Sequence, residues 1–440
     1  PFTCPPVRVA GPREGYCFMK RTIRDIFVIG FALFSMFFGA GNVVFPPYLG
    51  LESGKEWFIG FLCYYLADIG LALLALFAIQ FRGGTDGLTR RIGRIPSKLL
   101  MSAIVLCIGP MLAIPRTAAT TYEMSVMPLA SGVSPVLFSV LFFLLILLLC
   151  LRESAVVDIV GKILTPLLLA GLLILIVRGV LDPIGPVPDH TLVDNVPFTG
   201  IEAGYQTMDV LAALVFGAII LKSAENKGHT APRDKAVVVS GASIVAGCAL
   251  LVVYLGLTYL GVTTSRFFGL DVDRTYLVIA IVRNLLGSWG VWLFAVVAAL
   301  ACVTTAVALV SSAASYFSKL SGGRLSYTVL TVVVCVFSAV VSNFGLEQII
   351  SIAAPILNVV YPPALVLILL SFFDRFIKND WVFRLAALGA LLFSLLEVVS
   401  GFGLTLPILK LMPLASLGFG WVIPALVCGA VGFLIPSRKS

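Results

Sequence analysis

Charged side chains are scarce in this chain. Of its 440 residues only 12% are charged, whereas 60% are hydrophobic and the mean hydropathy is +1.07. A soluble globular domain carries about 25% charged residues, so this composition excludes an ordinary soluble protein. It predicts an all-α polytopic membrane protein that forms one helical bundle within the lipid bilayer.

Residues suited to metal or hydrolytic chemistry are also few. The two histidines, His190 and His229, fall in loops predicted to lie on opposite sides of the membrane. The nine cysteines form no Cys-x-x-Cys pair, and the sequence contains no Walker motif. These absences argue against an enzyme, a cofactor, a metal centre and an ATP-driven pump. The net charge of +8 arises from basic residues scattered in short loops, so we expect no nucleic-acid partner and no obligate protein partner.

Long apolar runs make up most of the chain, and twelve of them are long enough to span a bilayer at about 20 residues each. The predicted spans are 25–47, 56–80, 99–121, 134–151, 160–178, 203–222, 236–261, 287–317, 325–343, 347–373, 382–403 and 414–435. Residues 1–19 precede them as a tail without apolar periodicity, which we expect to be disordered.

The distribution of basic residues predicts the orientation of these spans. With the N-terminus in the cytoplasm, 23 of the 30 lysines and arginines fall in inward loops and seven in outward ones. Cytoplasmic loops of membrane proteins carry such an excess. The bias predicts twelve spans with both termini in the cytoplasm.

The first span contains a glycine-rich stretch from Gly39 to Pro47, with two glycines, an asparagine and a Pro-Pro pair, although residues 26–51 carry no charge. These residues weaken or stop a helix. Unpaired backbone is tolerated at membrane depth only where it is buried in protein or lines a cavity. A break at the midplane therefore predicts a site for a small solute or an ion. The alternative is a proline kink in an ordinary span.

A second interruption falls in the sixth span, where residues 202–210 are polar for a membrane entry. Five helices separate the two interrupted spans, so these spans run in opposite directions. This placement predicts an inverted repeat of two five-helix units, 20–180 and 203–375, joined by an extracellular loop, 181–202, and followed by two additional helices in 376–440. Half-helix N-termini attract a carboxylate and half-helix C-termini attract an ammonium group, so the pattern favours an amino acid as the solute.

The eighth span contains a candidate ion site. The Ala301 carbonyl and the hydroxyls of Thr304 and Thr305 share one helical face, and such oxygens suit sodium. The alternative is that both threonines bond back to their own helix. This span is also unusually long, because residues 285–318 carry no charge. That length predicts either a strongly tilted helix or a surface helix that runs into the span.

Four ionisable residues fall in or near predicted spans. A charge at the bilayer centre costs at least ~2.5–3.5 kcal/mol, so each should face protein or water. Asp209 is a candidate to cap the inner half-helix, to bind the substrate ammonium group or to exchange a proton. Asp68 and Arg116 are interpreted as structural partners in an outer vestibule, and Glu397 as structural.

Several stretches of the chain resemble the branched-chain amino acid:cation symporter family (BrnQ type). The matching stretches are Phe38–Pro47 (FGAGNVVFPP), Gly109–Thr117 (GPMLAIPRT), Gly204–Asp209 (GYQTMD) and Cys302–Ala306 (CVTTA). The resemblance implies the leucine-transporter (LeuT) type fold, a place in the bacterial inner membrane, and sodium-coupled uptake of leucine, isoleucine and valine. Proton coupling, or a transporter-like sensor or channel, is the alternative.

The resemblance also assigns roles to particular residues. The substrate site that it implies comprises Ala40, Gly41, Asn42, Tyr205, Gln206, Thr207, Asp209 and Phe216. In it, the N–H groups of Ala40 and Gly41 face the substrate carboxylate, and Phe216 contacts the aliphatic side chain.

Further implied roles concern the two breaks and the ion. Pro46 and Pro47 begin the outer half of the first span, and residues 205–207 lie in the unwound section of the sixth. The sodium ligands that the resemblance implies are Ser35, Phe38, Ala301, Thr304 and Thr305.

Overall fold

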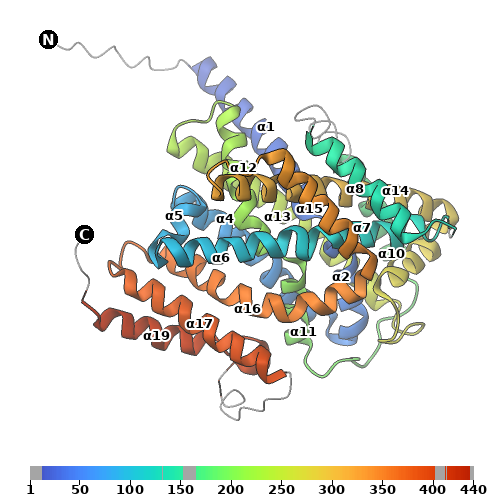
Figure 1. Ribbon diagram of the computed structural model, residues 1–440. Coiled ribbons are helices and arrows are strands. Elements are labelled where there is room, and N and C mark those ends of the chain that lie inside the picture. The colour runs from blue at the N-terminus through green and yellow to red at the C-terminus, as the bar shows by residue number, and fades with distance from the viewer. Residues whose placement is uncertain (1–11, 131, 152–164, 402–411, 413, 437–440) are drawn as a thin grey trace.

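The structure is a computed structural model that describes residues 12–130, 132–151, 165–401, 412 and 414–436. Its α-helices are α1 (Pro12–Phe37), α2 (Ala40–Ser53), α3 (Trp57–Tyr65), α4 (Leu71–Phe81), α5 (Thr85–Thr89), α6 (Arg94–Leu106), α7 (Ala113–Thr121), α8 (Pro135–Leu151), α10 (Thr165–Leu181), α11 (Val196–Thr207), α12 (Asp209–Asn226), α13 (Pro232–Val262), α14 (Arg274–Leu320), α15 (Tyr327–Val341), α16 (Leu346–Phe372), α17 (Asp380–Gly401) and α19 (Val422–Leu434). Two π-helical turns, η2 (Leu66–Gly70) and η4 (Cys107–Met111), interrupt the second and third predicted spans, and a third, η5 (Tyr122–Val126), follows directly after the third span. Figure 1 shows how the helices pack into one bundle.

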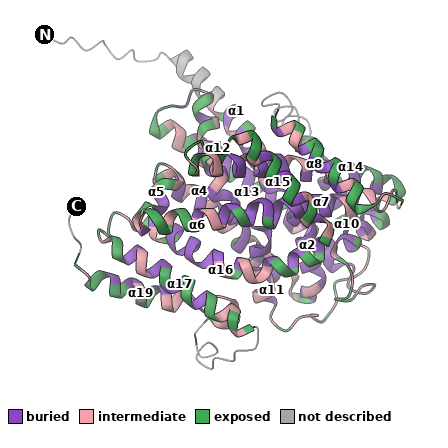
Figure 2. Ribbon diagram, in the orientation of Figure 1, coloured by how far each residue is buried: buried purple, intermediate pink, exposed green. Residues whose placement is uncertain are grey.

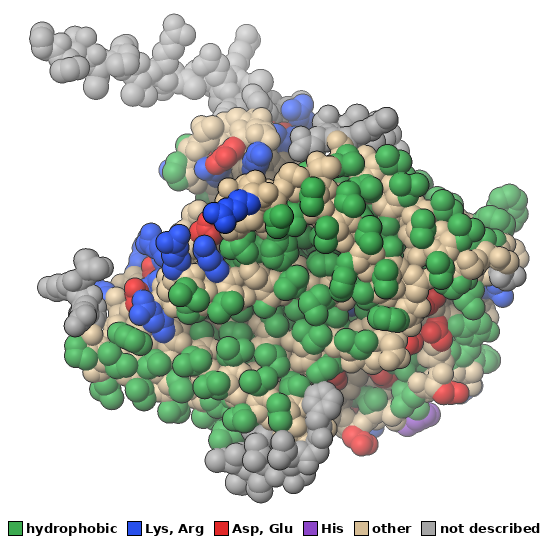
Figure 3. Space-filling model, viewed as in Figure 1, with side chains coloured by type: hydrophobic (Ala, Val, Ile, Leu, Met, Phe, Trp, Pro, Cys, Tyr) green, Lys and Arg blue, Asp and Glu red, His purple; other side chains and the backbone are tan. Residues whose placement is uncertain are grey.

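The surface has the character of a membrane protein. Within the described residues, eight helical runs are long and apolar enough to cross a bilayer, and three shorter apolar helices, α8, α10 and α19, accompany them. In Figure 3 most of the visible Lys and Arg gather at the upper left with some Asp and Glu among them, most of the visible Asp and Glu lie at the lower right, and hydrophobic side chains cover the surface between. The prediction of an all-α polytopic membrane protein is confirmed.

The interior of the bundle is formed around the interrupted helices. Nearly every residue of α2 is buried, as are most residues in the first half of α12. In Figure 2 buried residues fill the middle of the bundle, whereas exposed residues lie along its outer helices. The helix breaks predicted from the sequence therefore lie away from the lipid-facing surface.

Two predicted boundaries differ from the structure. Helix α1 begins at Pro12, so the part of the predicted tail after residue 11 is helical rather than disordered; residues 1–11 lie outside the described residues. Helix α11 begins at Val196, inside the predicted extracellular loop. Asn195 explains this early start, because its side chain accepts a hydrogen bond from the Phe198 N–H at 3.1 Å and caps the helix.

The long helix of the eighth span is kinked near its start. Helix α14 is 47 residues long, and Gly287 within it has non-helical angles (φ 66°, ψ −164°). This kink separates residues 274–286 from the rest of α14. The span's length therefore comes from two helical segments that meet at a kink, and not from one straight helix.

Candidate functional site

The first span is broken over two residues. Helix α1 ends at Phe37 and α2 begins at Ala40, and between them Gly39 is extended (φ −116°, ψ −159°). The Gly39 N–H donates to Asn42 Oδ1 at 3.3 Å, so a side chain of α2 satisfies a donor that the break leaves free. The predicted break in the first span is present and lies at its glycine end.

The prediction that Pro46 and Pro47 begin the outer half-helix is wrong. Both prolines lie inside α2, which begins six residues earlier at Ala40. Proline lacks an N–H group, so the carbonyls of Asn42 and Val43, four residues before each proline, lose their helical donors. The helix therefore tolerates the pair, but its first turns keep fewer internal hydrogen bonds.

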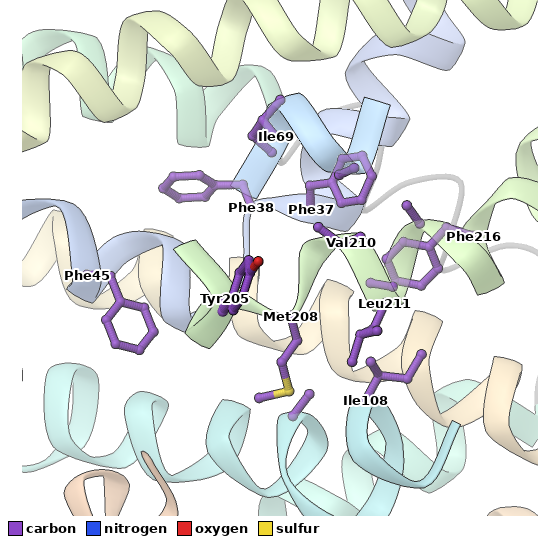
Figure 4. Packing of buried hydrophobic residues seen from close by; sticks show 14 of the residues in the cluster. Phe37, Phe38, Phe45, Ile69, Ile108, Tyr205, Met208, Val210, Leu211 and Phe216 are labelled. Atoms are coloured by element: carbon purple, nitrogen blue, oxygen red, sulfur yellow. The ribbon is translucent and has the colours of Figure 1, made fainter. Parts of the chain in front are cut away.

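The sixth span is broken at a single residue. Met208 adopts the left-handed conformation (φ 69°, ψ 13°) between α11 and α12. That conformation costs a non-glycine residue about 1–2 kcal/mol. Tyr205, Gln206 and Thr207 form the last turn of α11 instead of an unwound section. Figure 4 shows Met208 where the ribbon of α11 and α12 is interrupted.

A hydrogen-bond network joins the two breaks. Asn42 Nδ2, at the start of α2, donates to Asp209 Oδ2, at the start of α12, at 2.7 Å. The same Asn42 side chain contacts the Tyr254 hydroxyl of α13. All three side chains are almost fully buried. The N-cap residue of α12 is Met208, whose side chain makes no capping hydrogen bond, and the hydrogen bond observed for the Asp209 carboxylate joins it to the first break.

Arg116 lies at the sixth-span break, contrary to the predicted outer vestibule. Its side chain is buried and donates from Nη1 to the Gln206 carbonyl at 2.5 Å and from Nη2 to the Thr207 carbonyl at 3.0 Å. These carbonyls have no helical donor because α11 ends there, and a cation is favourable at a helix C-terminus. The guanidinium group thereby holds the end of α11.

The third span brings Arg116 to this position because it is itself interrupted. Gly109 in η4 has non-helical angles (φ −94°, ψ −128°), and helix α7 starts only at Ala113. The first break also lies close to the Arg116 guanidinium group, on its other side. A Cβ atom at Gly41 would lie 2.9 Å from Arg116 Nη2, so only glycine fits beside the guanidinium group.

Asp68 also belongs to the sixth-span break. It sits on the π-helical turn η2, and its Oδ1 atom accepts from the Thr207 hydroxyl at 2.7 Å. Helix α11 comes this close because of Gly204, where a Cβ atom would lie 2.9 Å from the Tyr64 carbonyl oxygen. The structure places Asp68 on Thr207, not in the outer vestibule with Arg116 as predicted.

A small cavity lies where the breaks meet. Ala40, Gly41 and Arg116 line its positive side, Asp209 contributes a carboxyl group, and Phe216 contributes an apolar wall. Its volume is about 20 Å³. About 10–15 Å³ suffices for one water molecule, so an amino acid enters only if the helices move apart. The cavity joins a cationic end, an anionic group and an apolar wall.

Two of the predicted substrate residues do not line this cavity. The Tyr205 ring stacks on Tyr361 of α16, with ring centroids 4.5 Å apart. Gln206 contributes its carbonyl to Arg116, and its side-chain Oε1 is buried without a partner. Phe216 does line it, and its ring lies 6.1 Å from the Phe37 ring (Figure 4).

The predicted sodium ligands fall into two neighbouring groups. Ser35, Ala301 and Thr304 line one cavity of about 10 Å³, in which the Thr304 hydroxyl donates to the Ala301 carbonyl at 2.8 Å. Thr305 lines the central cavity, where its hydroxyl is buried without a partner beside Gly39. The alternative of back-bonding is thus observed for Thr304.

Phe38, the fifth predicted sodium ligand, lies in the first break. Its ring stacks on Phe34 and packs against Tyr254. Phe38 lines neither of the two small cavities. The structure therefore brings the residues of α1 and α14 together, but they do not form one common cage.

A much larger cavity, with a volume of about 760 Å³, lies elsewhere. It is lined by residues from η5, α8, α14 and the turn before α16, among them Glu123, Thr275 and Arg283. Neither helix break borders it. By size alone this cavity would be the candidate substrate site. The small cavity is favoured instead, because the exposed helix ends at the two breaks can bind a charged solute.

Comparison with known proteins decides the family. Residues 22–439 match the family described as "Branched-chain amino acid transport protein". The chain belongs to this family. Similar members include the branched-chain amino acid permease BraB of Bacillus subtilis, 36% identical with coverage of 94% of this chain and 96% of the relative. The branched-chain amino acid transport system 3 carrier protein of Pseudomonas aeruginosa is also 36% identical, with the same two coverages.

Solved structures with a similar fold support the predicted fold type of this chain. A sodium-coupled sialic acid symporter aligns with a TM-score of 0.64 and 15% identity, covering 94% of this chain and 91% of the other. The transporter MhsT in complex with L-phenylalanine aligns with a TM-score of 0.55 and 15% identity, covering 92% and 98%. These are LeuT-type structures, so the predicted fold type is confirmed. The family is one of transporters and not of enzymes, as the sequence predicts.

Proposed function

We propose that this chain is a secondary active transporter that imports leucine, isoleucine and valine by sodium-coupled symport and alternating access. The central cavity is the single observation that carries the proposal. It places the N-terminus of α2 and the Arg116 guanidinium near the Asp209 carboxyl group, with Phe216 beside them. A zwitterionic amino acid with an aliphatic side chain presents the matching three groups.

In this proposal each end of the substrate has its own partner. The substrate carboxylate binds the N–H groups of Ala40 and Gly41 together with Arg116, because a helix N-terminus and a guanidinium group both favour an anion. The ammonium group binds near Asp209, which already holds Asn42 across the two breaks. The side chain packs on Phe216, whose ring is almost fully buried. The similar permease and carrier proteins of branched-chain amino acids support this class of solute.

The proposed architecture has twelve spans in the bacterial inner membrane. Two inverted five-helix units, 20–180 and 203–375, surround the site, 181–202 connects them outside the cell, and 376–440 adds two helices. The gathering of basic side chains at one end of the molecule supports this orientation, since the start of α1 and the end of α19 lie toward that end (Figures 1 and 3). Both termini are then cytoplasmic.

Sodium is the proposed coupling ion. Ser35, Ala301 and Thr304 from α1 and α14 surround one small cavity, and the free hydroxyl of Thr305 lies beside the break in the first span. An ion held between these helices would fix α1 against α14 and favour a closed substrate site. Proton coupling is the second candidate, because the carboxyl group of Asp209 lines the substrate cavity.

Uptake of radiolabelled leucine by purified protein in liposomes tests the proposal. We expect an inward sodium gradient to drive uptake, and unlabelled isoleucine and valine to compete with leucine. A pH gradient alone should drive little. Uptake driven only by the pH gradient would remove the sodium assignment, and stronger competition by phenylalanine than by valine would remove the aliphatic pocket.

A further inference from the structure

Two buried carboxyl groups from different spans meet beside the substrate cavity. Asp68 on η2 and Asp209 on α12 are joined through Thr207, whose hydroxyl donates to Asp68 Oδ1 at 2.7 Å and accepts from the Asp209 N–H at 3.4 Å. Asp68 is fully buried and Asp209 is 4% exposed. Two ionised carboxylates repel at such close approach, and neither can donate a hydrogen bond to the other. A single proton between them removes the repulsion and provides the missing donor.

The hydrogen bonds around the pair leave one acceptor without a donor. Asp68 Oδ1 accepts from Thr207, and Asp209 Oδ2 accepts from Asn42, each at 2.7 Å. Asp68 Oδ2 is buried without a hydrogen-bond partner. The Tyr64 hydroxyl is also fully buried without a hydrogen-bond partner. Unsatisfied buried oxygens are uncommon in folded proteins, so the pair is a site at which a proton is expected.

The charged groups around the two aspartates also favour one proton on the pair. The titratable and charged groups that face it from the surrounding helices are Arg116 of α7, Tyr64 of α3, Tyr254 of α13 and Tyr361 of α16. The tyrosines are neutral donors, so the guanidinium group of Arg116 is the one cation among these groups. Two ionised aspartates would leave an excess negative charge in the middle of the bundle, whereas one shared proton makes the group neutral.

We propose that Asp68 and Asp209 share one proton and form a proton-binding pair beside the substrate cavity. The inference deepens the proposed function, because Asp209 lines that cavity and Asp68 does not. The proton is thereby held next to the place where the substrate ammonium group would bind. Of the proposed sodium ligands, Thr305 of α14 lines the same cavity as Asp209, whereas Ser35, Ala301 and Thr304 line the other small cavity.

Infrared spectroscopy of the purified full-length protein in lipid vesicles, without leucine, tests this proposal. A protonated carboxylic acid has a carbonyl stretching band distinct from carboxylate bands, and the band shifts in D₂O. We expect this band at neutral pH in the unmodified protein. Asp68→Asn and Asp209→Asn should each abolish it, since the remaining carboxylate is then balanced by Arg116. Glu397→Gln, which changes a partly buried carboxyl group of α17, should leave the pair's band in place.

Two results would overturn the proposal. The first is the absence of the band from the unmodified protein at neutral pH. This result does not depend on whether any variant folds. The other is a band of full intensity in both aspartate variants. Leucine uptake measured on the same vesicles separates this proposal from the transport proposal. Protein that shows the band but takes up no leucine would refute transport and leave the proton-binding pair standing.

Discussion

Replacing Arg116 tests whether its guanidinium group binds the substrate carboxylate. The side chain already donates to the Gln206 and Thr207 carbonyls, and Gly41 leaves room for its Nη2 atom on the opposite side. A hydrogen bond to a charged group contributes about 1.5–3 kcal/mol. Every 1.4 kcal/mol is about tenfold in affinity, so Arg116→Gln should weaken leucine binding about 10- to 100-fold.

The assay is isothermal titration of purified protein in the presence of sodium, with leucine and with leucinol. Leucinol carries a hydroxyl group where leucine has its carboxylate, so it reports binding without the carboxylate contact. Arg116→Gln should weaken leucine far more than leucinol, and the difference is the coupling between Arg116 and the carboxylate. Arg178→Gln is the matched control, because Arg178 is exposed and paired with Asp182 outside the site.

Unchanged leucine affinity in Arg116→Gln would refute the assignment. Equal losses for leucine and leucinol would also refute it, because Arg116 would then act only by holding the end of α11. Arg116→Lys separates charge from geometry. It keeps the cation but loses the planar fork that reaches two carbonyls, so we expect a leucine affinity between those of the unmodified protein and Arg116→Gln.

Three further variants probe the remaining parts of the site. Gly41→Ala should weaken leucine binding, because its Cβ atom would press on Arg116 Nη2 and overpacking costs about 1–3 kcal/mol; titration with wild-type affinity would contradict this. Thr304→Ala combined with Thr305→Ala should raise the sodium concentration needed for half-maximal uptake, and an unchanged sodium requirement would clear both residues of a coordinating role. Phe216→Ala should reduce affinity for leucine more than for alanine, since it removes a buried apolar wall; equal reductions in a competition assay would argue against contact with the substrate side chain.

The sequence located the two broken helices but could not define their limits. Glycine, proline and polar residues within an apolar run are a local signal, so the interruptions in the first and sixth spans were visible. Their exact positions depend on tertiary contacts. Nothing about Met208 predicts a left-handed residue, and its cost is offset by partners such as Arg116 that lie far away in the chain. Pro46 and Pro47 were the stronger helix breakers by type, yet α2 continues through both.

Long-range pairing was the part that the sequence could not supply. Hydropathy placed Arg116 near the outer end of the third span, because a straight helix was assumed. The interruption at Gly109 and the break at Met208 bring it to the end of α11 instead. Asp68 and Asp209 are also far apart in the sequence, and no spacing rule predicts that their carboxyl groups meet. The Gly-Pro pair at Gly109 and Pro110 is the sequence signal of this third interruption.

A structure determined with bound leucine and sodium tests the central claim most directly. The account predicts leucine between the two helix breaks, with its carboxylate at Gly41 and Arg116, its ammonium group at Asp209 and its side chain on Phe216. The cavity of about 20 Å³ must be enlarged around it. Leucine bound instead in the cavity of about 760 Å³ near Glu123, with both breaks unchanged, would contradict the account.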